Sequence, residues 1–224
     1  MLRFITPVRV PEYRKALSQT LAEWEIHLPT YLFDKTHYRG IPIWKNPLDL
    51  WIFQEIIHET KPRFIIEIGS RFGGTTQFLA DLLELQGGDA IVISIDIDRN
   101  GYRANHPRIR TITGSSMEPS VIAQVKSFCT GPGGMVVHDG DHNRRAVLSD
   151  LNNYSSLVGI GNYFIVEDGI MDEFWPGRGP GSHCDGPLPA IDDFLETNQN
   201  FAVDSSRERY VLTENPKGYL RRIC

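Results

Sequence analysis

The sequence has little of what three large classes of protein require. Its three cysteines have no CxxC spacing, which argues against a zinc site or a disulfide framework and predicts free thiols. No apolar run approaches the roughly 20 residues of a membrane-spanning helix, and no secretory signal follows the first methionine. Lysine and arginine total 23 against 28 acidic residues, a net charge of −5. We therefore expect a soluble cytoplasmic protein that binds neither nucleic acid nor membranes.

The composition is that of an ordinary globular protein. Of the 224 residues, 41% are hydrophobic and 23% are charged, so the chain can bury a core without cross-links. The length fits one large domain. Residues 1–42 lack a clean periodicity apart from a helix expected over 12–26. We interpret them as an N-terminal extension, or lid, packed on a domain of residues 43–224.

Helices and apolar strands alternate from Asn46-Pro47 onward, where an N-cap residue precedes a proline at the first helical position. The expected helices cover 47–60, 75–85, 120–128, 144–157 and 190–196, and the expected strands cover 63–68, 90–95, 111–113, 134–138 and 163–166. Segments 201–204 and 209–212 resemble a terminal hairpin. Continuous apolar strands separated by helices are typical of a parallel sheet covered on both faces, so the fold class is α/β with an antiparallel edge.

A glycine-rich turn, Glu67-Ile68-Gly69-Ser70-Arg71-Phe72-Gly73-Gly74-Thr75, follows the first of these strands. Glycines let a backbone approach a ligand closely, and the next helix offers free N–H groups. The spacing is not that of dinucleotide enzymes, and a carboxylate at this place suits a cationic ligand rather than a pyrophosphate. Asp96, which ends the next strand, can accept hydrogen bonds from ribose hydroxyls.

S-adenosylmethionine combines a positive centre with an adenosine and has no phosphate, so it fits both acids. The residues predicted to bind it are Glu67, Gly69, Ser70, Gly73, Thr75 and Asp96. One alternative is a tight strand-to-helix turn beside a solvated acid. Another is a nicotinamide-dependent oxidoreductase, which the glycine spacing disfavours.

Acidic residues follow two further strands, in His138-Asp139-Gly140-Asp141-His142 and in Glu167-Asp168. Because the carboxyl ends of neighbouring parallel strands meet at one edge of a sheet, Asp139, Glu167 and Asp168 are predicted to hold one ion. Oxygen donors without a thiolate favour Mg²⁺, with Mn²⁺ or Ca²⁺ as alternatives, over zinc. The competing interpretation is a group of strand-end acids that cap helices.

His142, three residues after Asp139, is the candidate general base, because the unperturbed pKa of histidine lies near working pH. A structural or substrate-contacting histidine is the alternative. Eight of the fourteen residues from 176 to 189 are glycine or proline, a composition typical of a functional or mobile loop. His183 in this loop and Trp175 at its mouth are predicted to contact substrate.

Four aromatic residues in the first quarter of the chain are candidates for a wall of the substrate pocket. They are Tyr31, Tyr38, Trp44 and Trp51. Tyr38 is the predicted substrate contact among them. Trp51 lies inside the expected helix 47–60, so we expect it in the core instead.

Seven short segments in order make the chain similar to the cephalosporin hydroxylase family. They are residues 40–51, 66–70, 94–98, 113–116, 139–142, 165–168 and 215–220. Despite its name, that family resembles class I O-methyltransferases that use S-adenosylmethionine and Mg²⁺ on natural products, antibiotics or sugars. The resemblance implies a Rossmann-like, mostly parallel seven-stranded sheet with an antiparallel C-terminal strand. It also implies an ion at Asp139, Glu167 and Asp168, a base at His142, and an adenine bordered by Ser115 and Ser116.

The sequence thus predicts an Mg²⁺-dependent O-methyltransferase acting on a hydroxyl of a small molecule. Asp139 is expected to serve the ion, the cofactor site and catalysis, and His142 to remove the hydroxyl proton. A non-catalytic subunit that binds S-adenosylmethionine is the main alternative, and an oxygenase is disfavoured because iron sites of that class need two histidines. The family and the N-terminal segment suggest a homo-oligomer. The acceptor is not identified, and the resemblance is weakest over residues 1–37.

Overall fold

A seven-stranded sheet forms the centre of the molecule in the computed structural model, which describes residues 17–33, 35–174 and 185–224. Its strand order is β5-β4-β3-β6-β7-β9-β8. The strands are β3 (Phe64–Ile68), β4 (Ile91–Asp96), β5 (Ile109–Thr113), β6 (Met135–His138), β7 (Tyr163–Val166), β8 (Phe201–Val203) and β9 (Tyr219–Arg222). All neighbours among β3 to β7 run parallel, and β9 is antiparallel to both β7 and β8. The predicted mostly parallel sheet with an antiparallel C-terminal strand is confirmed.

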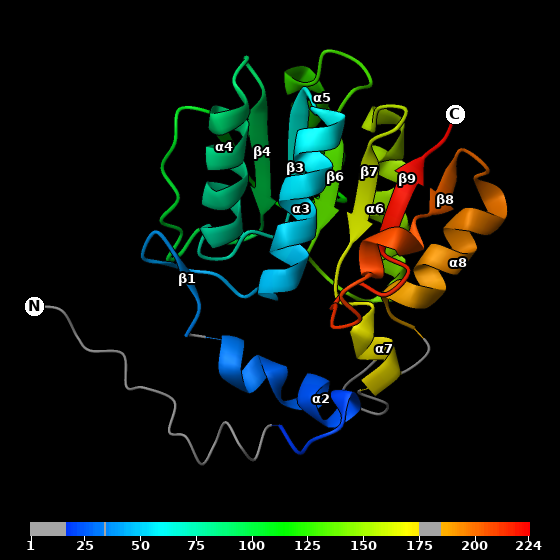
Figure 1. Ribbon diagram of the computed structural model, residues 1–224. Coiled ribbons are helices and arrows are strands. Elements are labelled where there is room, and N and C mark those ends of the chain that lie inside the picture. Colours follow the sequence, from blue (N-terminus) through cyan, green and yellow to red (C-terminus); the bar gives the residue numbers. More distant parts are fainter. Residues whose placement is uncertain (1–16, 34, 175–184) are drawn as a thin grey trace, which may run out of the picture.

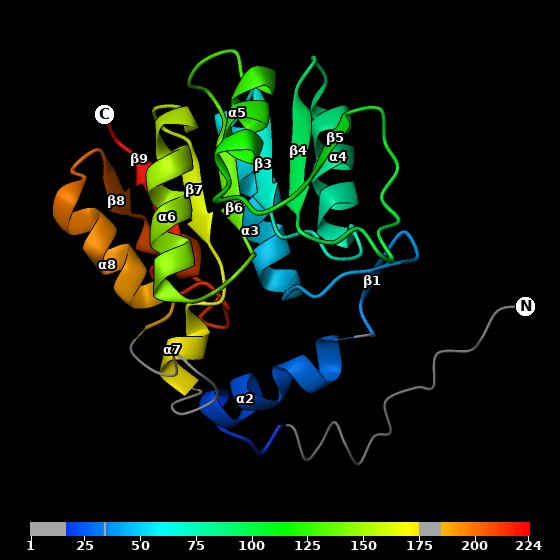
Figure 2. The ribbon, with the colours of Figure 1, turned by 180° about the vertical axis from the view of Figure 1, so that it is seen from behind.

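Helices cover both faces of the sheet (Figures 1 and 2). One face packs against α3 (Pro47–Thr60) and α4 (Gly74–Gln86), and the other against α5 (Pro119–Phe128), α6 (Arg144–Tyr154) and α8 (Pro187–Thr197). Side chains alternate across β3: Phe64, Ile66 and Ile68 join the second face, whereas Ile65 joins the first. This alternation places Glu67 on the α4 side of the sheet.

Two helices lie beyond the carboxyl ends of the parallel strands and are seen below the sheet in Figure 1. They are α2 (Leu21–Leu32), from the N-terminal segment, and α7 (Ile170–Phe174), which follows β7. The short pair β1 (His37–Tyr38) and β2 (Ile41–Pro42) then leads to α3. Of the helix expected over 12–26, residues 12–16 lie outside the described part of the chain, and the remainder is wrong in its bounds, because residues 17–20 are not helical and α2 continues to Leu32. Thr20 accepts from the Glu23 backbone, and the Glu23 side chain accepts from Thr20, a capping box that begins the helix at Leu21.

Two further expectations are wrong. Residues 209–212 form no strand: Val211 has a φ of +69° and is exposed, and the second arm of the hairpin is β9 instead. Trp51 is 56% exposed rather than in the core, and its Nε1 donates to Glu55. β-branched and aromatic residues favour strands and cores, but both segments face solvent here.

The described residues also bear on the absences noted in the sequence. Cys129 and Cys224 are free thiols, as expected. Within the same residues, none of the helices has the length and apolar character needed to cross a bilayer.

Candidate active site

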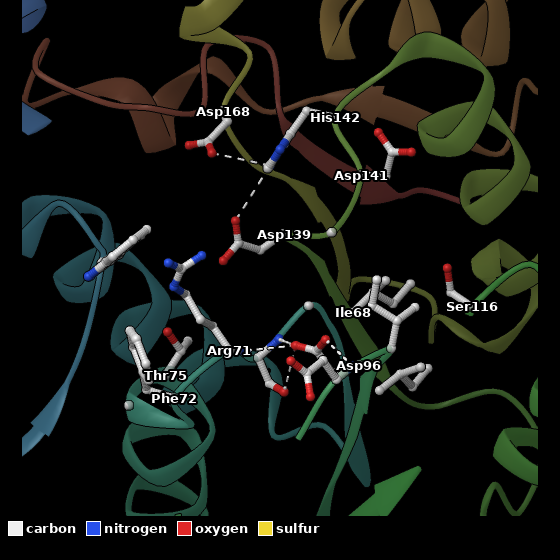
Figure 3. A pocket seen from close by; sticks show the side chains of 18 of the residues that line it. Ile68, Arg71, Phe72, Thr75, Asp96, Ser116, Asp139, Asp141, His142 and Asp168 are labelled. Atoms are coloured by element: carbon white, nitrogen blue, oxygen red, sulfur yellow. Dashed lines mark hydrogen bonds and ion pairs between the residues drawn. The ribbon is translucent and has the colours of Figure 1, made fainter. Parts of the chain in front are cut away.

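A cavity of about 1010 Å³ opens at the carboxyl edge of the sheet. Its walls come from the turns after β3, β4, β5, β6 and β7, together with Pro29 and Leu32 of α2 and the following Phe33. Figure 3 shows two groups of polar side chains in it, one around Asp96 and one around Asp139, His142 and Asp168. Most of the residues predicted to bind cofactor, and Asp139 and Asp168 of those predicted to bind an ion, therefore share one cavity.

Two glycines of the glycine-rich turn pack closely against neighbouring residues. Gly69 has a φ of +82°, and a Cβ there would lie 2.0 Å from the Asp139 carbonyl oxygen. Gly73 has a φ of +85°, and a Cβ there would lie 2.8 Å from the Tyr102 ring. Only glycine combines this backbone conformation with such contacts. Gly69 lines the cavity together with Ser70 and Thr75, whereas Gly73 supports the turn from behind.

Asp96 holds the glycine turn in shape. One carboxylate oxygen accepts from the Ser70 N–H at 2.8 Å and the Arg71 N–H at 2.7 Å, and the other accepts from the Asp98 N–H at 3.1 Å. Burial raises the pKa of Asp96, but these backbone donors outweigh it and leave the pKa below its usual value. The anionic side chain remains at the cavity wall.

Glu67 does not line the cavity. It is buried on the α4 side, where one oxygen accepts from the Thr76 hydroxyl and the other has no hydrogen-bond partner. Burial raises its pKa to about 7. The structure therefore separates Glu67 from the other predicted cofactor residues.

Ser115 and Ser116 line the far side of the cavity. The Ser116 hydroxyl donates to Asp150 at 2.8 Å, and its carbonyl accepts from the Tyr154 hydroxyl at 2.6 Å. His138 is fully buried 3.3 Å from the same Asp150 carboxylate, a structural position in line with its place inside β6. These contacts fix the backbone of the turn that follows β5.

Three of the predicted residues converge at the ends of β6 and β7. His142 Nε2 lies 3.1 Å from Asp168 Oδ2 and 3.5 Å from Asp139 Oδ1, and Figure 3 shows all three side chains pointing toward one another. One ligand atom from each lies within 4.8 Å of the others, a geometry that could hold a metal ion. Asp168 takes a φ of +60°, rare for a residue with a Cβ, and its N–H donates to Asn215. Such strain is typical of functional positions.

Burial lowers the pKa of His142, but the negative charges of Asp168 and Asp139 outweigh it and raise the pKa above its usual value. Without a cation between the carboxylates, His142 is therefore drawn toward its protonated form. A cation in this group would oppose that effect.

Glu167, the third predicted ion ligand, lies beside this group and contacts a residue that sequence reasoning missed. It is 2% exposed, and its Oε2 accepts from Lys45 Nζ, while its Oε1 has no hydrogen-bond partner within the described part of the chain. Lys45 Nζ also donates to Asp139 Oδ2. Burial raises the pKa of Glu167, whereas the Lys45 charge holds that of Asp139 below its usual value in spite of burial. Lys45 stands 94 and 122 residues before its partners, so no local signal could identify it.

The predicted substrate contacts fare unequally. Tyr38 does not line the cavity, because its hydroxyl donates to Asp81 at 3.0 Å and its ring packs edge-on against Phe78. Trp175 and His183 lie outside the described residues. Trp44 does line the cavity.

Two residues at the cavity wall escaped the sequence reasoning. The guanidinium of Arg71 lies 3.6 Å over the Trp44 ring, whose other face stacks on Phe33 of the N-terminal segment at 4.4 Å. Glu214 lines the cavity near Asp168, and burial raises its pKa to about 8. Nothing in the sequence distinguishes Arg71 and Glu214 from the many charged residues that proteins expose at their surface.

Comparisons with known proteins agree with this architecture. The family model of rhamnosyl O-methyltransferase/CmcI matches residues 30–223. Rhamnosyl O-methyltransferase of Mycobacterium tuberculosis is 29% identical over 219 residues, covering 92% of this chain and 85% of that protein. The Mycobacterium leprae protein of the same name is 32% identical over 200 residues, covering 86% and 85%.

Among solved structures, CmcI with Mg and SAM has a TM-score of 0.67 at 19% identity, covering 100% of this chain and 88% of that chain. At this identity the likeness shows the fold, which is the predicted class I methyltransferase fold. The predicted resemblance to the cephalosporin hydroxylase family is thereby confirmed. From the match over residues 30–223, the chain belongs to the rhamnosyl O-methyltransferase/CmcI family of O-methyltransferases.

Proposed function

We propose that this protein transfers a methyl group from S-adenosylmethionine to a hydroxyl of a small molecule with the help of Mg²⁺. The observation that carries the proposal is the convergence of Asp139, His142 and Asp168 in one cavity with the glycine turn. Relatives named rhamnosyl O-methyltransferase and a solved relative with Mg and SAM support it. A sugar hydroxyl, including that of a natural product or antibiotic, is the acceptor class to test first.

The cofactor would lie along the turn after β3, with its ribose at Asp96 and its adenine near Ser115 and Ser116. Asp96 already accepts from three backbone N–H groups, and a carboxylate can accept a further hydrogen bond on its remaining lone pairs. Ser70 and Thr75 line the wall beside it. Glu67, buried behind α4, would act on the positive end of the cofactor only through its charge and through Thr76.

The acids at the ends of β6 and β7 fit a hard divalent cation. Asp139 and Asp168 offer carboxylate oxygens, and Glu167 offers the buried Oε1 that has no partner in the described residues. When bound, such an ion supplies a Lewis acid that makes a nearby hydroxyl more acidic. We assign the site to Asp139, Glu167 and Asp168.

His142 would act as the general base. Its Nε2 would take the proton of the acceptor hydroxyl, and Asp168, 3.1 Å away, would stabilise the resulting imidazolium, while the cofactor when bound would supply the methyl group. Since an in-line displacement needs close alignment, the main task of the other residues is to position the two reactants. We further propose that residues 1–42 act as a lid, because Pro29, Leu32 and Phe33 wall the cavity. A homo-oligomer and a cytoplasmic location stay predictions.

The experiment that tests this function measures transfer of labelled methyl from S-adenosylmethionine to a panel of rhamnosides and other glycosides. We expect transfer by the parent protein, loss of at least about 100-fold after removal of divalent ions with a chelator, and recovery with Mg²⁺. The Asp139→Asn variant should remain inactive when Mg²⁺ is restored. Equal rates with and without divalent ions would contradict the ion's role, and cofactor binding without any transfer would favour a non-catalytic subunit.

A further inference from the structure

One lysine lies buried among the acids of the candidate ion site. Lys45 is 5% exposed, and its Nζ donates to Asp139 on the turn after β6 and to Glu167 on the turn after β7. It enters from the segment that leads into α3, far from both partners in the sequence. Burying an ammonium group costs free energy unless carboxylates pair with it. The carboxylates of Asp139 and Glu167 supply that pairing for Lys45.

The contacts of Lys45 divide the oxygens of its partners into two sets. Lys45 binds Asp139 Oδ2 and Glu167 Oε2. The remaining oxygens are Asp139 Oδ1, which lies 3.5 Å from His142 Nε2, and Glu167 Oε1, which is buried with no hydrogen-bond partner in residues 17–33, 35–174 and 185–224. Each carboxylate therefore keeps one oxygen for another ligand while the other oxygen is anchored.

The segment that carries Lys45 is itself held in place. The neighbouring Asn46 caps α3 by accepting from the Leu48 N–H at 3.0 Å and donates to the Leu212 carbonyl at 3.3 Å. Lys45 therefore starts from a fixed backbone. A donor fixed in this way orients the two carboxylates that it binds.

We propose that Lys45 is a positioning residue of the ion site, an inference that rests on the proposed function. It anchors one oxygen each of Asp139 and Glu167, so that their other oxygens are presented to the divalent cation. Its charge also offsets part of the negative charge of the three acids when the cation is absent.

Two effects of Lys45 on cation affinity have opposite signs, which makes the proposal testable. If Lys45 only repels the incoming cation, replacing it by a neutral residue should tighten cation binding. If it positions the carboxylates, the same change should weaken binding, by about 10-fold or more, because groups that orient metal ligands typically have effects of that size.

The experiment measures Mn²⁺ binding to the cofactor-free full chain by electron paramagnetic resonance, without any activity assay. We expect Lys45→Met to weaken Mn²⁺ binding about 10-fold or more, and Lys45→Arg, which keeps a charged donor, to recover most of that loss. Lys126→Met is the matched control, since Lys126 is exposed on α5, and it should bind Mn²⁺ like the parent. Lys45→Gln replaces Lys45→Met, with the same criterion, if circular dichroism shows that the methionine variant does not fold.

Unchanged or tighter Mn²⁺ binding by Lys45→Met or Lys45→Gln would overturn the inference and leave the proposed function intact. Failure of the parent to bind Mn²⁺ would overturn the inference together with the ion site of the proposed function. Measuring Mn²⁺ binding to the parent protein is enough to distinguish the two failures.

Discussion

The two ends of the cavity are built in different ways. At the cofactor end, Asp96 accepts from the backbone of Ser70 and Arg71, and these residues come from two consecutive strand–turn units. At the ion end, Lys45 joins Asp139 and Glu167 from positions more than 90 residues away, and His142 lies between Asp139 and Asp168. The first end satisfies its acid with nearby N–H groups, whereas the second gathers several acids around Lys45 and His142, where we propose that a cation binds. The comparison teaches that the first end is preformed and the second depends on what it binds.

The largest expected effect tests the ion end. His142→Gln should lower kcat by about 10²- to 10⁴-fold, because it removes the base that takes the hydroxyl proton. The measurement pairs methyl-transfer kinetics with Mn²⁺ binding. His58→Gln, at an exposed position of α3, should behave like the parent. A loss of Mn²⁺ binding equal to the loss of kcat would show that His142 serves as an ion ligand rather than as the base.

The next prediction concerns the point where the two ends touch. Gly69→Ala should destabilise the protein, because its Cβ would collide with the Asp139 carbonyl at the boundary between the ends. Gly87→Ala is the control, since Gly87 has a similar φ of +81° and no atom within 4 Å of its Cβ. Denaturant unfolding should show an added loss of about 1–3 kcal/mol for the Gly69 variant. Equal losses would mean that only the backbone conformation matters at Gly69.

At the cofactor end, Asp96→Asn should raise the KM for S-adenosylmethionine about 10-fold with a smaller change in kcat. The amide cannot accept on both sides, so the hydrogen bond from the Asp98 N–H is lost and the glycine turn loosens. Initial-rate kinetics check the split between KM and kcat. Asp89→Asn, the same change at an exposed position, should leave both unchanged. A fall in kcat alone would contradict a role confined to cofactor binding.

The smallest effect concerns the lid. Glu25 on α2 is 6% exposed, and neither carboxylate oxygen has a hydrogen-bond partner among the described residues. Burial first, and then the charge of Asp49, raise its pKa to about 7 from 4.5. Since the docked helix favours protonated Glu25, docking should weaken as the pH rises from about 5 to about 8.

Glu25→Gln should remove that dependence. Hydrogen exchange of residues 21–32, corrected for intrinsic rates, should be about 10-fold slower than in the parent at pH 8 and similar at pH 5. Glu196→Gln, at an exposed position of α8, is the control. Equal exchange in the parent and the Glu25 variant at both pH values would show that Glu25 is not charged in the docked helix.

Much of the fold followed from local patterns. The N-cap Asn46 with Pro47, the apolar run of β3 and the break at Gly87 gave α3, β3 and α4 within one or two residues. The wrong predictions concern residues whose type favours strands or cores but whose side chains are exposed to solvent. Val211 and Trp51 belong to residue types common in strands and cores, but both are exposed in the described part of the chain.

For the candidate site too, some features could be predicted from the sequence and others could not. By itself the sequence determined the order of strands and helices, the glycine turn, and the acids at the carboxyl ends of strands, because each depends on the periodicity and chemistry of neighbouring residues. Only the tertiary structure decided that Lys45 lies between Asp139 and Glu167, that Glu67 is turned away from the cavity, and that Tyr38 binds Asp81 instead of lining it. These placements depend on which segments pack together across the sheet. The spacing of residues along the chain does not reveal which distant segments will pack together.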